Sequence, residues 1–190
     1  MSVKVGGKIM IWIILAIVVI LLLYVISTYN LLVSLRNRME DSWAQIEVLL
    51  KRRADLIPNL VETVKGYAKH EEGTLEGVVE ARNKALSATT REEEIEASGE
   101  VTKALSHLFA LTESYPELKA NVNFMDLQNN LKDTEDKISF SRQFYNDSVL
   151  KYKNKLEMFP SNIVASLFKF KKPVFFEVTD AEREVPKVQF

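Results

Sequence analysis

Residues 9–26 read IMIWIILAIVVILLLYVI, eighteen consecutive apolar or aromatic side chains, and nine uncharged residues follow them. About 20 residues of α-helix, rising about 1.5 Å each, cross a hydrocarbon core about 30 Å thick. A helix also satisfies its own backbone hydrogen bonds, which lipid requires. Trp12 lies near one end of the run, with Tyr24 and Tyr29 near the other, and such residues favour the two membrane interfaces. We therefore predict a short tail and a transmembrane anchor in residues 1–35.

A cleaved signal peptide is the competing interpretation of this run, because Lys4 and Lys8 precede it. The run is longer than the roughly 7–15 apolar residues of a signal peptide, and no small-residue cleavage site follows it. The two lysines before the run are matched by Arg36 and Arg38 after it, so the charges leave its orientation open.

The overall charge is nearly balanced, with 25 Lys and Arg against 26 Asp and Glu. Without Lys4 and Lys8, 23 basic and 26 acidic residues remain, a net charge of −3. A mildly acidic domain does not attract a polyanion over long range, which argues against nucleic-acid binding. The chain has no cysteine, which excludes disulfides, thiolate nucleophiles and cysteine-based metal sites. Gly (6) and Pro (5) are scarce, so long regular helices are expected.

Apolar residues beyond the anchor alternate at spacings of three and four, which predicts amphipathic helices. We favour a break of the first stripe near Pro58, with Asp55 capping a new helix and Pro58 in its first turn. One long helix kinked at Pro58 is the alternative. This first stripe comprises Trp43, Ile46, Leu50, Ile57, Leu60, Val64 and Tyr67, with Arg53 interrupting it.

The next helix is expected over residues 56–86, followed by a turn at 87–90. Thr90 and Glu93 have the spacing of a capping box and predict the start of a third helix, which ends before Pro116. A fourth helix ends before Pro160. Its stripe comprises Ala120, Phe124, Leu127, Leu131, Thr134, Ile138, Ser141, Tyr145, Ser148, Tyr152, Leu156 and Phe159.

The predicted fold is therefore all-α: an N-terminal transmembrane helix (within residues 1–35), an antiparallel four-helix bundle (residues 36–160) and an irregular C-terminal segment (residues 161–190). Short turns between helices of similar length favour antiparallel neighbours. An even number of such helices returns the chain to the side from which it started, so the C-terminal segment is expected near the bilayer.

Many short motifs spread over nearly the whole chain resemble those of the LemA family. They are Tyr29-Asn30, Arg36-Asn37-Arg38, Trp43-Ala44-Gln45-Ile46, Arg52-Arg53-Ala54-Asp55-Leu56-Ile57-Pro58-Asn59-Leu60-Val61, Val64-Lys65-Gly66-Tyr67, His70-Glu71, Ala81-Arg82, Tyr115-Pro116-Glu117-Leu118-Lys119-Ala120, Phe124, Leu127-Gln128, Thr134-Glu135, Arg142, Tyr145-Asn146, Tyr152, Phe159-Pro160-Ser161-Asn162 and Val185-Pro186-Lys187-Val188-Gln189-Phe190.

The resemblance implies one transmembrane helix followed by a helical bundle, in agreement with the patterns above. It also implies a single-pass protein of a bacterial inner or plasma membrane, with a short N-terminus outside the cell and the bundle in the cytoplasm. It implies no settled biochemical activity. Domains of this kind also occur in proteins of specialised bacterial membranes, which points to a membrane-organising role.

The three residues Arg52, Arg53 and Asp55 form a candidate partner-binding cluster at the expected distal turn of the bundle. They suit an acidic partner or a phosphate. The structural alternative is favoured: Arg53 pairs with a carboxylate on the apolar stripe while Asp55 caps a helix, because helix ends need such groups.

The segment 161–176 mixes aromatic residues with lysines, as is typical of the membrane headgroup region. The alternative is that it folds back over the membrane-proximal end of the bundle, and the sequence does not decide between the two. The candidate membrane-interface residues are Phe168, Lys169, Phe170, Lys171, Lys172, Phe175 and Phe176.

No catalytic, metal-binding or cofactor-binding motif is found, so we expect neither enzymatic activity nor a cofactor. The favoured function is a membrane-anchored interaction or scaffold protein that binds another membrane protein, with homo-oligomerisation open. The alternative is a lipid-engaging, membrane-organising module acting through its Phe- and Lys-rich segment. Lipids are expected as partners of the anchor, and nucleic acid is not.

Overall fold

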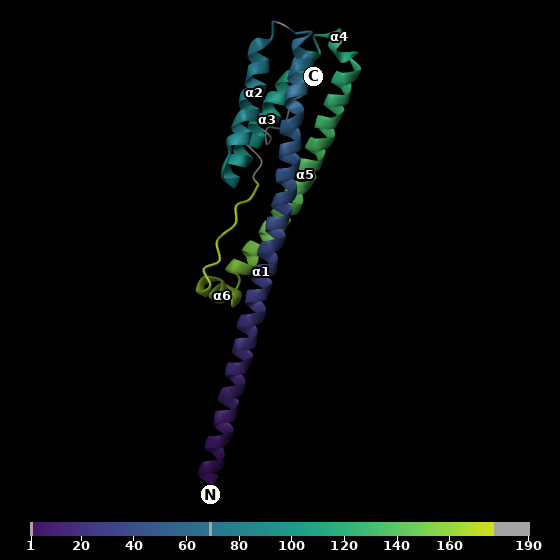
Figure 1. Cartoon of the computed structure of the whole chain (residues 1–190). Helices are drawn as coiled ribbons and strands as arrows, with labels where there is room; N and C mark the ends of the chain where they lie inside the picture. Colours follow the sequence, from purple (N-terminus) through teal and green to yellow (C-terminus); the bar gives the residue numbers. More distant parts are fainter. Residues whose placement is uncertain (1, 69, 177–190) are drawn as a thin grey trace, which may run out of the picture. The chain divides into compact units, whose positions relative to one another are not determined.

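A computed structural model describes residues 2–68 and 70–176 of the chain, with side chains from residue 10 onward. No strand occurs in these residues. The elements, labelled in Figure 1, are α1 (Ser2–Lys65), α2 (Glu72–Ser87), α3 (Arg91–Thr112), the single-turn α4 (Pro116–Lys119), α5 (Val122–Glu157) and α6 (Ser161–Leu167).

The first part of α1 is an uncovered apolar helix. Among the described residues, it is the one helix long and apolar enough to cross a membrane, and none of its most apolar 18-residue window is buried. Residues 10–27 carry no buried side chain, whereas Thr28 and Leu32 are buried. Those 18 residues of helix span about 27 Å, close to the thickness of a hydrocarbon core. Protein packing on α1 therefore begins where a membrane-spanning stretch would end.

The described residues pack as two compact units, to which α1 and α5 each contribute. The anchor unit consists of the chain up to Asp41 together with Asp147–Pro173. The bundle unit consists of Ser42–Asn146 together with residues 174–176.

Four long helices build the bundle unit, namely the last part of α1, then α2, α3 and most of α5, and the single-turn α4 lies between α3 and α5. The Trp43 and Tyr145 rings lie 5.1 Å apart, and Arg53 reaches Glu135. From the first contact to the second, the residue number rises along α1 and falls along α5, so these two helices are antiparallel. Figure 1 shows α2 and α3 lying side by side. The main core cluster comprises Ile57, Leu60, Val64, Ala68, Leu75, Val78, Ala81, Val101, Leu105, Leu108, Leu118, Phe124 and Leu131.

The helical pattern read from the sequence is confirmed in its main features. The predicted stripe positions Trp43, Ile46, Leu131 and Ile138 are all buried. The helix predicted over residues 56–86 is wrong in extent, because α1 ends at Lys65 and α2 begins at Glu72, and Tyr67 between them is exposed. The capping box also forms: the Thr90 hydroxyl accepts a hydrogen bond from the Glu93 N–H (3.3 Å), and a Glu93 carboxylate oxygen accepts one from the Thr90 N–H (3.1 Å). Hydrogen bonds from the backbone of Thr89 and Thr90 hold the pKa of the Glu93 carboxyl below its usual value.

The predicted break at Pro58 is wrong. Helix α1 continues through Pro58 to Lys65, and Asp55 does not cap a helix; its carboxylate lies 3.5 Å from the Lys51 amine. A proline inside a helix leaves the carbonyl four residues earlier without its N–H partner. Here that carbonyl belongs to Ala54, and the Nε of Arg82, from α2, donates a hydrogen bond to it at 2.9 Å. Arg82 therefore supplies the donor that Pro58 lacks.

A double-mutant cycle tests whether the Arg82 side chain replaces the backbone N–H that Pro58 lacks. Arg82→Met is expected to lower the free energy of unfolding by about 1–3 kcal/mol, because the Ala54 carbonyl loses its donor. In a Pro58→Ala background the backbone N–H returns, and the same Arg82 substitution should cost clearly less. Thermal unfolding of the four proteins measures the coupling. Equal costs of Arg82→Met in the two backgrounds would show that the side chain does not replace the missing N–H.

The C-terminal segment was expected to be irregular, but residues 161–167 form the helix α6. The Ser161 hydroxyl donates hydrogen bonds to the carbonyls of Lys155 (2.7 Å) and Met158 (2.9 Å) at the end of α5. Beyond α6, residues 168–169 form a turn and residues 170–176 have no regular secondary structure. The Tyr152 hydroxyl donates to the Lys171 carbonyl at 3.2 Å. Residues 177–190, which complete the predicted C-terminal segment, lie outside the described residues.

Candidate functional site

The candidate partner-binding residues Arg52, Arg53 and Asp55 lie inside α1, not at the distal turn predicted from the sequence. They do not form one surface cluster. Arg52 and Asp55 are exposed, whereas the Arg53 side chain is only 2% exposed. The misplacement follows from the expected break at Pro58, which moved a helix end to this position.

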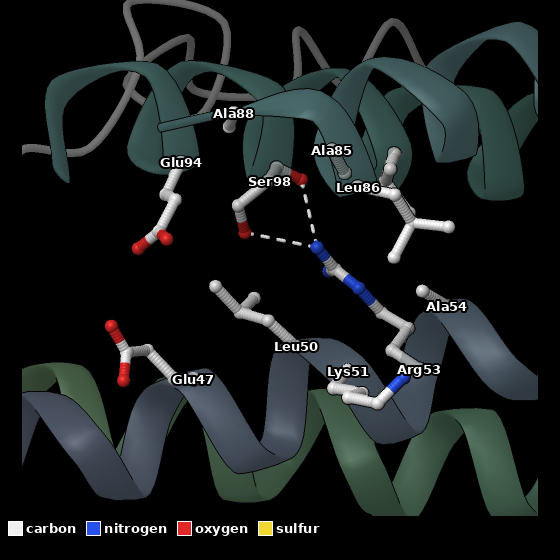
Figure 2. Close-up of a pocket in the computed structure, with 11 residues that line it drawn as sticks. Glu47, Leu50, Lys51, Arg53, Ala54, Ala85, Leu86, Ala88, Glu94 and Ser98 are labelled. Carbon is white, nitrogen blue, oxygen red and sulfur yellow. Dashed lines mark hydrogen bonds between the residues drawn. The ribbon is translucent and has the colours of Figure 1, made fainter. Parts of the chain in front are cut away.

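Arg53 is the polar centre of the bundle unit. Its Nη1 donates to Glu135 Oε2 (2.6 Å) and to Thr102 Oγ1 (2.9 Å). Its Nη2 donates to the Ser98 hydroxyl (2.9 Å) and carbonyl (3.1 Å), both drawn in Figure 2. Burial lowers the pKa of the guanidinium, and the Glu135 carboxylate opposes this shift. These contacts join α1, α3 and α5. Arg53 therefore interrupts the apolar stripe because it pairs with a carboxylate inside the bundle, as the structural alternative proposed.

The anchor unit exposes a group of large apolar side chains around the α5–α6 turn. Phe159 is 79% exposed, although the sequence pattern assigned it to the buried stripe of α5. That prediction was wrong because α5 ends at Glu157, so the helical spacing no longer applies at Phe159. We call this group the turn patch; it comprises Met158, Phe159, Ile163, Leu167 and Phe168.

Lys169 ends α6 in a conformation that L-residues rarely adopt, with φ 54°. The N–H of Phe170 bonds to the Ala165 carbonyl (3.0 Å), and that of Lys169 to the Ser166 carbonyl (3.1 Å). This is the Schellman arrangement, in which glycine is usual at the left-handed position. A lysine there costs about 1 kcal/mol or more relative to glycine.

The end of α6 packs against α1 just beyond its uncovered apolar stretch. The Tyr29 ring lies 4.8 Å from the Phe168 ring and 5.7 Å from the Phe170 ring, measured between centroids. The Arg36 guanidinium carbon lies 5.7 Å from the centroid of the Phe170 ring. Tyr29 directly follows Thr28, the first buried residue after the apolar stretch. The turn patch therefore belongs to the part of the anchor unit that adjoins the end of the apolar stretch.

The charge of the two units differs in sign. Residues 10–41 and 147–173 hold eight Lys and Arg but only four Asp and Glu, a net charge of +4. Residues 42–146 hold 13 Lys and Arg and 18 Asp and Glu, a net charge of −5. Around α6, Lys169 and Lys171 are exposed, and the Lys172 amine lies 3.7 Å from a Glu157 carboxylate oxygen. Three lysines thus follow the turn patch directly along the chain.

Phe176 belongs to the bundle unit and is only 3% exposed. Its ring lies 6.0 Å from that of Trp43, with the Arg142 guanidinium carbon 4.2 Å from its centroid. The Asn146 side chain exchanges two hydrogen bonds with its backbone, at 2.9 and 3.0 Å. Phe175 is half-buried. The predicted interface set therefore divides: Phe168, Lys169, Phe170, Lys171 and Lys172 gather beside the turn patch, whereas Phe176 covers the bundle.

Residues 42–190 match the LemA family. The chain belongs to the LemA family. The protein LemA of Metamycoplasma hominis is 23% identical over 149 residues, 78% of this chain and 68% of that protein. The magnetosome proteins MamQ 2 of Paramagnetospirillum magneticum (22%) and MamQ of Magnetospirillum gryphiswaldense (24%) align with 78% of this chain, which spans 64% of their lengths.

The predicted membership of the LemA family is therefore confirmed, and the chain is a membrane-associated protein. None of these names denotes an enzyme. Sequence reasoning named the Phe and Lys residues after α6 but missed Met158 and Phe159 as exposed residues. The signal that could have found them is Pro160, because a helix usually ends before the residue preceding a proline.

Proposed function

We propose that this LemA family protein is a non-catalytic, membrane-anchored module that engages an anionic bilayer surface through the turn patch and the lysines that follow it. The observation that carries the proposal is the exposure of Phe159, Ile163 and Leu167 within the basic anchor unit, beside the end of the apolar stretch of α1. Exposed contiguous apolar side chains ringed by charge mark interaction sites with proteins or membranes.

The energetics favour a lipid surface. A lysine near an anionic surface contributes about 1 kcal/mol, and full burial of a large apolar side chain contributes about 1.5–3 kcal/mol. Lys169 and Lys171, with Ile163 and Leu167, together supply both kinds of contribution. Because α1 already holds the chain in the membrane, these contacts need not recruit it; their role is to fix the anchor unit at the bilayer surface.

Site-directed fluorescence quenching tests this proposal in the full-length chain. The chain has no cysteine, so a fluorophore attached to Ser166→Cys is unique. In liposomes containing anionic lipid, this probe should be quenched by lipids carrying a quencher near the headgroup. A probe at Asp147→Cys, exposed on the same unit but about 15 Å before the end of α5, is the matched control and should be quenched less. Equal quenching at the two positions would refute the proposal.

Lys169→Gly separates charge from stability. Glycine suits the left-handed conformation of this position, so thermal stability should stay the same or rise. Quenching at Ser166 should nevertheless depend less on the anionic lipid content. The control is Lys132→Ala, at an exposed position of the bundle unit, which should not change the lipid dependence of the quenching. Alanine is used there because a glycine inside α5 would weaken the helix. Unchanged lipid dependence in Lys169→Gly would remove the lysine from the proposal.

An interaction or scaffold role is the second candidate, and one feature of the bundle unit favours it. Val48 (69% exposed) and Phe140 (65% exposed) lie on α1 and α5 at about the same level, between the Trp43–Tyr145 and Arg53–Glu135 contacts. A photo-crosslinking residue at position 140 should then capture a membrane protein in cells. The neighbouring exposed position Ser139 is the control, and equal capture at both positions would argue against a specific surface.

A further inference from the structure

A cavity of about 170 Å³ opens in the bundle unit between α1, the end of α2 and the start of α3 (Figure 2). It adjoins the Arg53 centre, because Arg53 and its hydrogen-bond partner Ser98 form part of its wall. The apolar wall is formed by Leu50, Ala54, Ala85, Leu86, Ala88 and Val101.

Two carboxylates face each other across this cavity, Glu47 from α1 and Glu94 from α3 (Figure 2). A Glu47 oxygen accepts a hydrogen bond from the Trp43 indole N–H at 2.8 Å. Oε2 of Glu94 is enclosed, and no donor among the described residues reaches it. A buried carboxylate oxygen without a donor is costly, so this arrangement favours a cationic or hydrogen-bonding group between the two carboxylates.

Electrostatics point the same way. Burial raises the pKa of the Glu94 carboxyl, and the neighbouring Glu47 charge raises it further. The Arg91 charge and a side-chain hydrogen bond with Trp43 oppose this shift, and the Arg91 guanidinium carbon lies 5.1 Å from the centroid of the Trp43 ring. The shift remains upward despite Arg91, so additional positive charge would be favourable here.

The cations that line the cavity are held by other groups. The Lys51 amine lies 3.5 Å from the carboxylate of Asp55, which follows it by four residues on α1. Arg53 bonds to Ser98 and Glu135. The chain therefore lines the cavity with two cations without placing either between the two carboxylates.

The acidic residues near the cavity extend over a region larger than one small ligand would cover. Residues 71–100, which include α2 and the first half of α3, hold nine Asp and Glu against three Lys and Arg. A field of this extent attracts a macromolecule of opposite charge more effectively than it attracts a single small cation. The charge pattern thus favours a basic protein over a free amine.

We propose that this cavity is a socket for a lysine side chain of a basic protein partner. The four-carbon stem of the lysine would lie against Leu50 and Leu86, and its ammonium group would lie between the Glu47 and Glu94 carboxylates. Lysine matches both halves of the site, because it buries an aliphatic stem while its compact head group keeps three donors. The inference concerns the bundle unit and is independent of the lipid-binding proposal.

The test uses the full-length chain in nanodiscs of neutral phosphatidylcholine, with methyl groups labelled for NMR. The probe is acetyl-Ala-Ala-Lys-Ala-Ala-amide, compared with the same peptide carrying norleucine in place of lysine. We expect the lysine peptide to shift the methyl signals of Leu50, Leu86 and Val101, with at least a tenfold weaker effect from the norleucine peptide. No shift with the lysine peptide, or equal binding of the two peptides, would overturn the proposal.

Variants separate the socket from the general acidity of the surface. Glu47→Gln/Glu94→Gln should weaken the lysine peptide about tenfold or more, whereas Glu92→Gln/Glu96→Gln, exposed on the first turns of α3, should have little effect. Leu86→Trp, which fills the cavity and leaves both carboxylates, should also abolish the shifts at Leu50 and Val101. Thermal melts confirm that each variant is folded. If the two double variants weaken binding equally, the peptide is recognised by surface charge alone and the socket is refuted.

Discussion

Ile138→Asp is expected to unfold the bundle unit. Ile138 is fully buried on α5, on the stripe that includes Leu131 and Tyr145. Deleting such a side chain costs about 2–5 kcal/mol, and an unpaired carboxylate in an apolar interior adds several more. The total approaches the stability of a whole domain, which is about 5–15 kcal/mol. Lys132→Asp, an exposed position on the same helix, should cost less than about 1 kcal/mol.

Trp43 fluorescence measures this effect without interference from the anchor. In a Trp12→Phe background Trp43 is the sole tryptophan, and it is buried in the bundle unit. Its emission in Ile138→Asp should resemble that of the unfolded chain, while Lys132→Asp should melt close to the parent protein. A parent-like emission and thermal midpoint for Ile138→Asp would show that the α5 stripe is not the core.

The second large effect concerns the ion pair at the bundle centre, and we expect it to be asymmetric. Glu135→Leu should cost about 3–5 kcal/mol, because it leaves the Arg53 guanidinium buried without its counter-charge. Arg53→Met should cost less, since the Glu135 side chain is 34% exposed and water can reach it once Arg53 is absent. The more buried partner is therefore expected to be the less costly one to replace.

The double variant Arg53→Met/Glu135→Leu completes the cycle. It removes both charges and fills the space with apolar side chains of similar volume, so it should be more stable than Glu135→Leu alone. Thermal unfolding followed by Trp43 gives the three differences and the coupling between the two residues. A larger loss in Arg53→Met than in Glu135→Leu would mean that the hydrogen bonds to Ser98 and Thr102 dominate over the unpaired charge.

Features governed by local sequence were predicted well. The helical stripes follow from the 3.6-residue period, and the start of α3 follows from the Thr90–Glu93 capping box. The uncovered apolar stretch of α1 likewise follows from run length alone. In each case the residues that decide the structure lie within one or two turns of each other, so a linear pattern contains the needed information.

Features governed by contacts between distant residues were not predictable in this way. The continuity of α1 depends on Arg82, which lies 28 residues beyond Ala54. The Arg53 position was recognised as an interruption of an apolar stripe, but Glu135, its partner, lies 82 residues away. The Phe and Lys composition marked the region after α6, yet only the contacts of Tyr29 and Trp43 divide it between the two units. The cavity at Glu47 and Glu94 has no sequence signal, because its walls come from three helices.

The hydrogen bond from Arg82 to Ala54 has a consequence for the order of folding. Before α2 docks, the helix around Pro58 has an unpartnered carbonyl, so its last turns are held only weakly. The two partners are only 28 positions apart, so closing the chain between them costs little entropy. The α1–α2 pair is therefore suited to form early as a cooperative hairpin. During synthesis, the distal end of α1 is expected to mature only after Arg82 has left the ribosome.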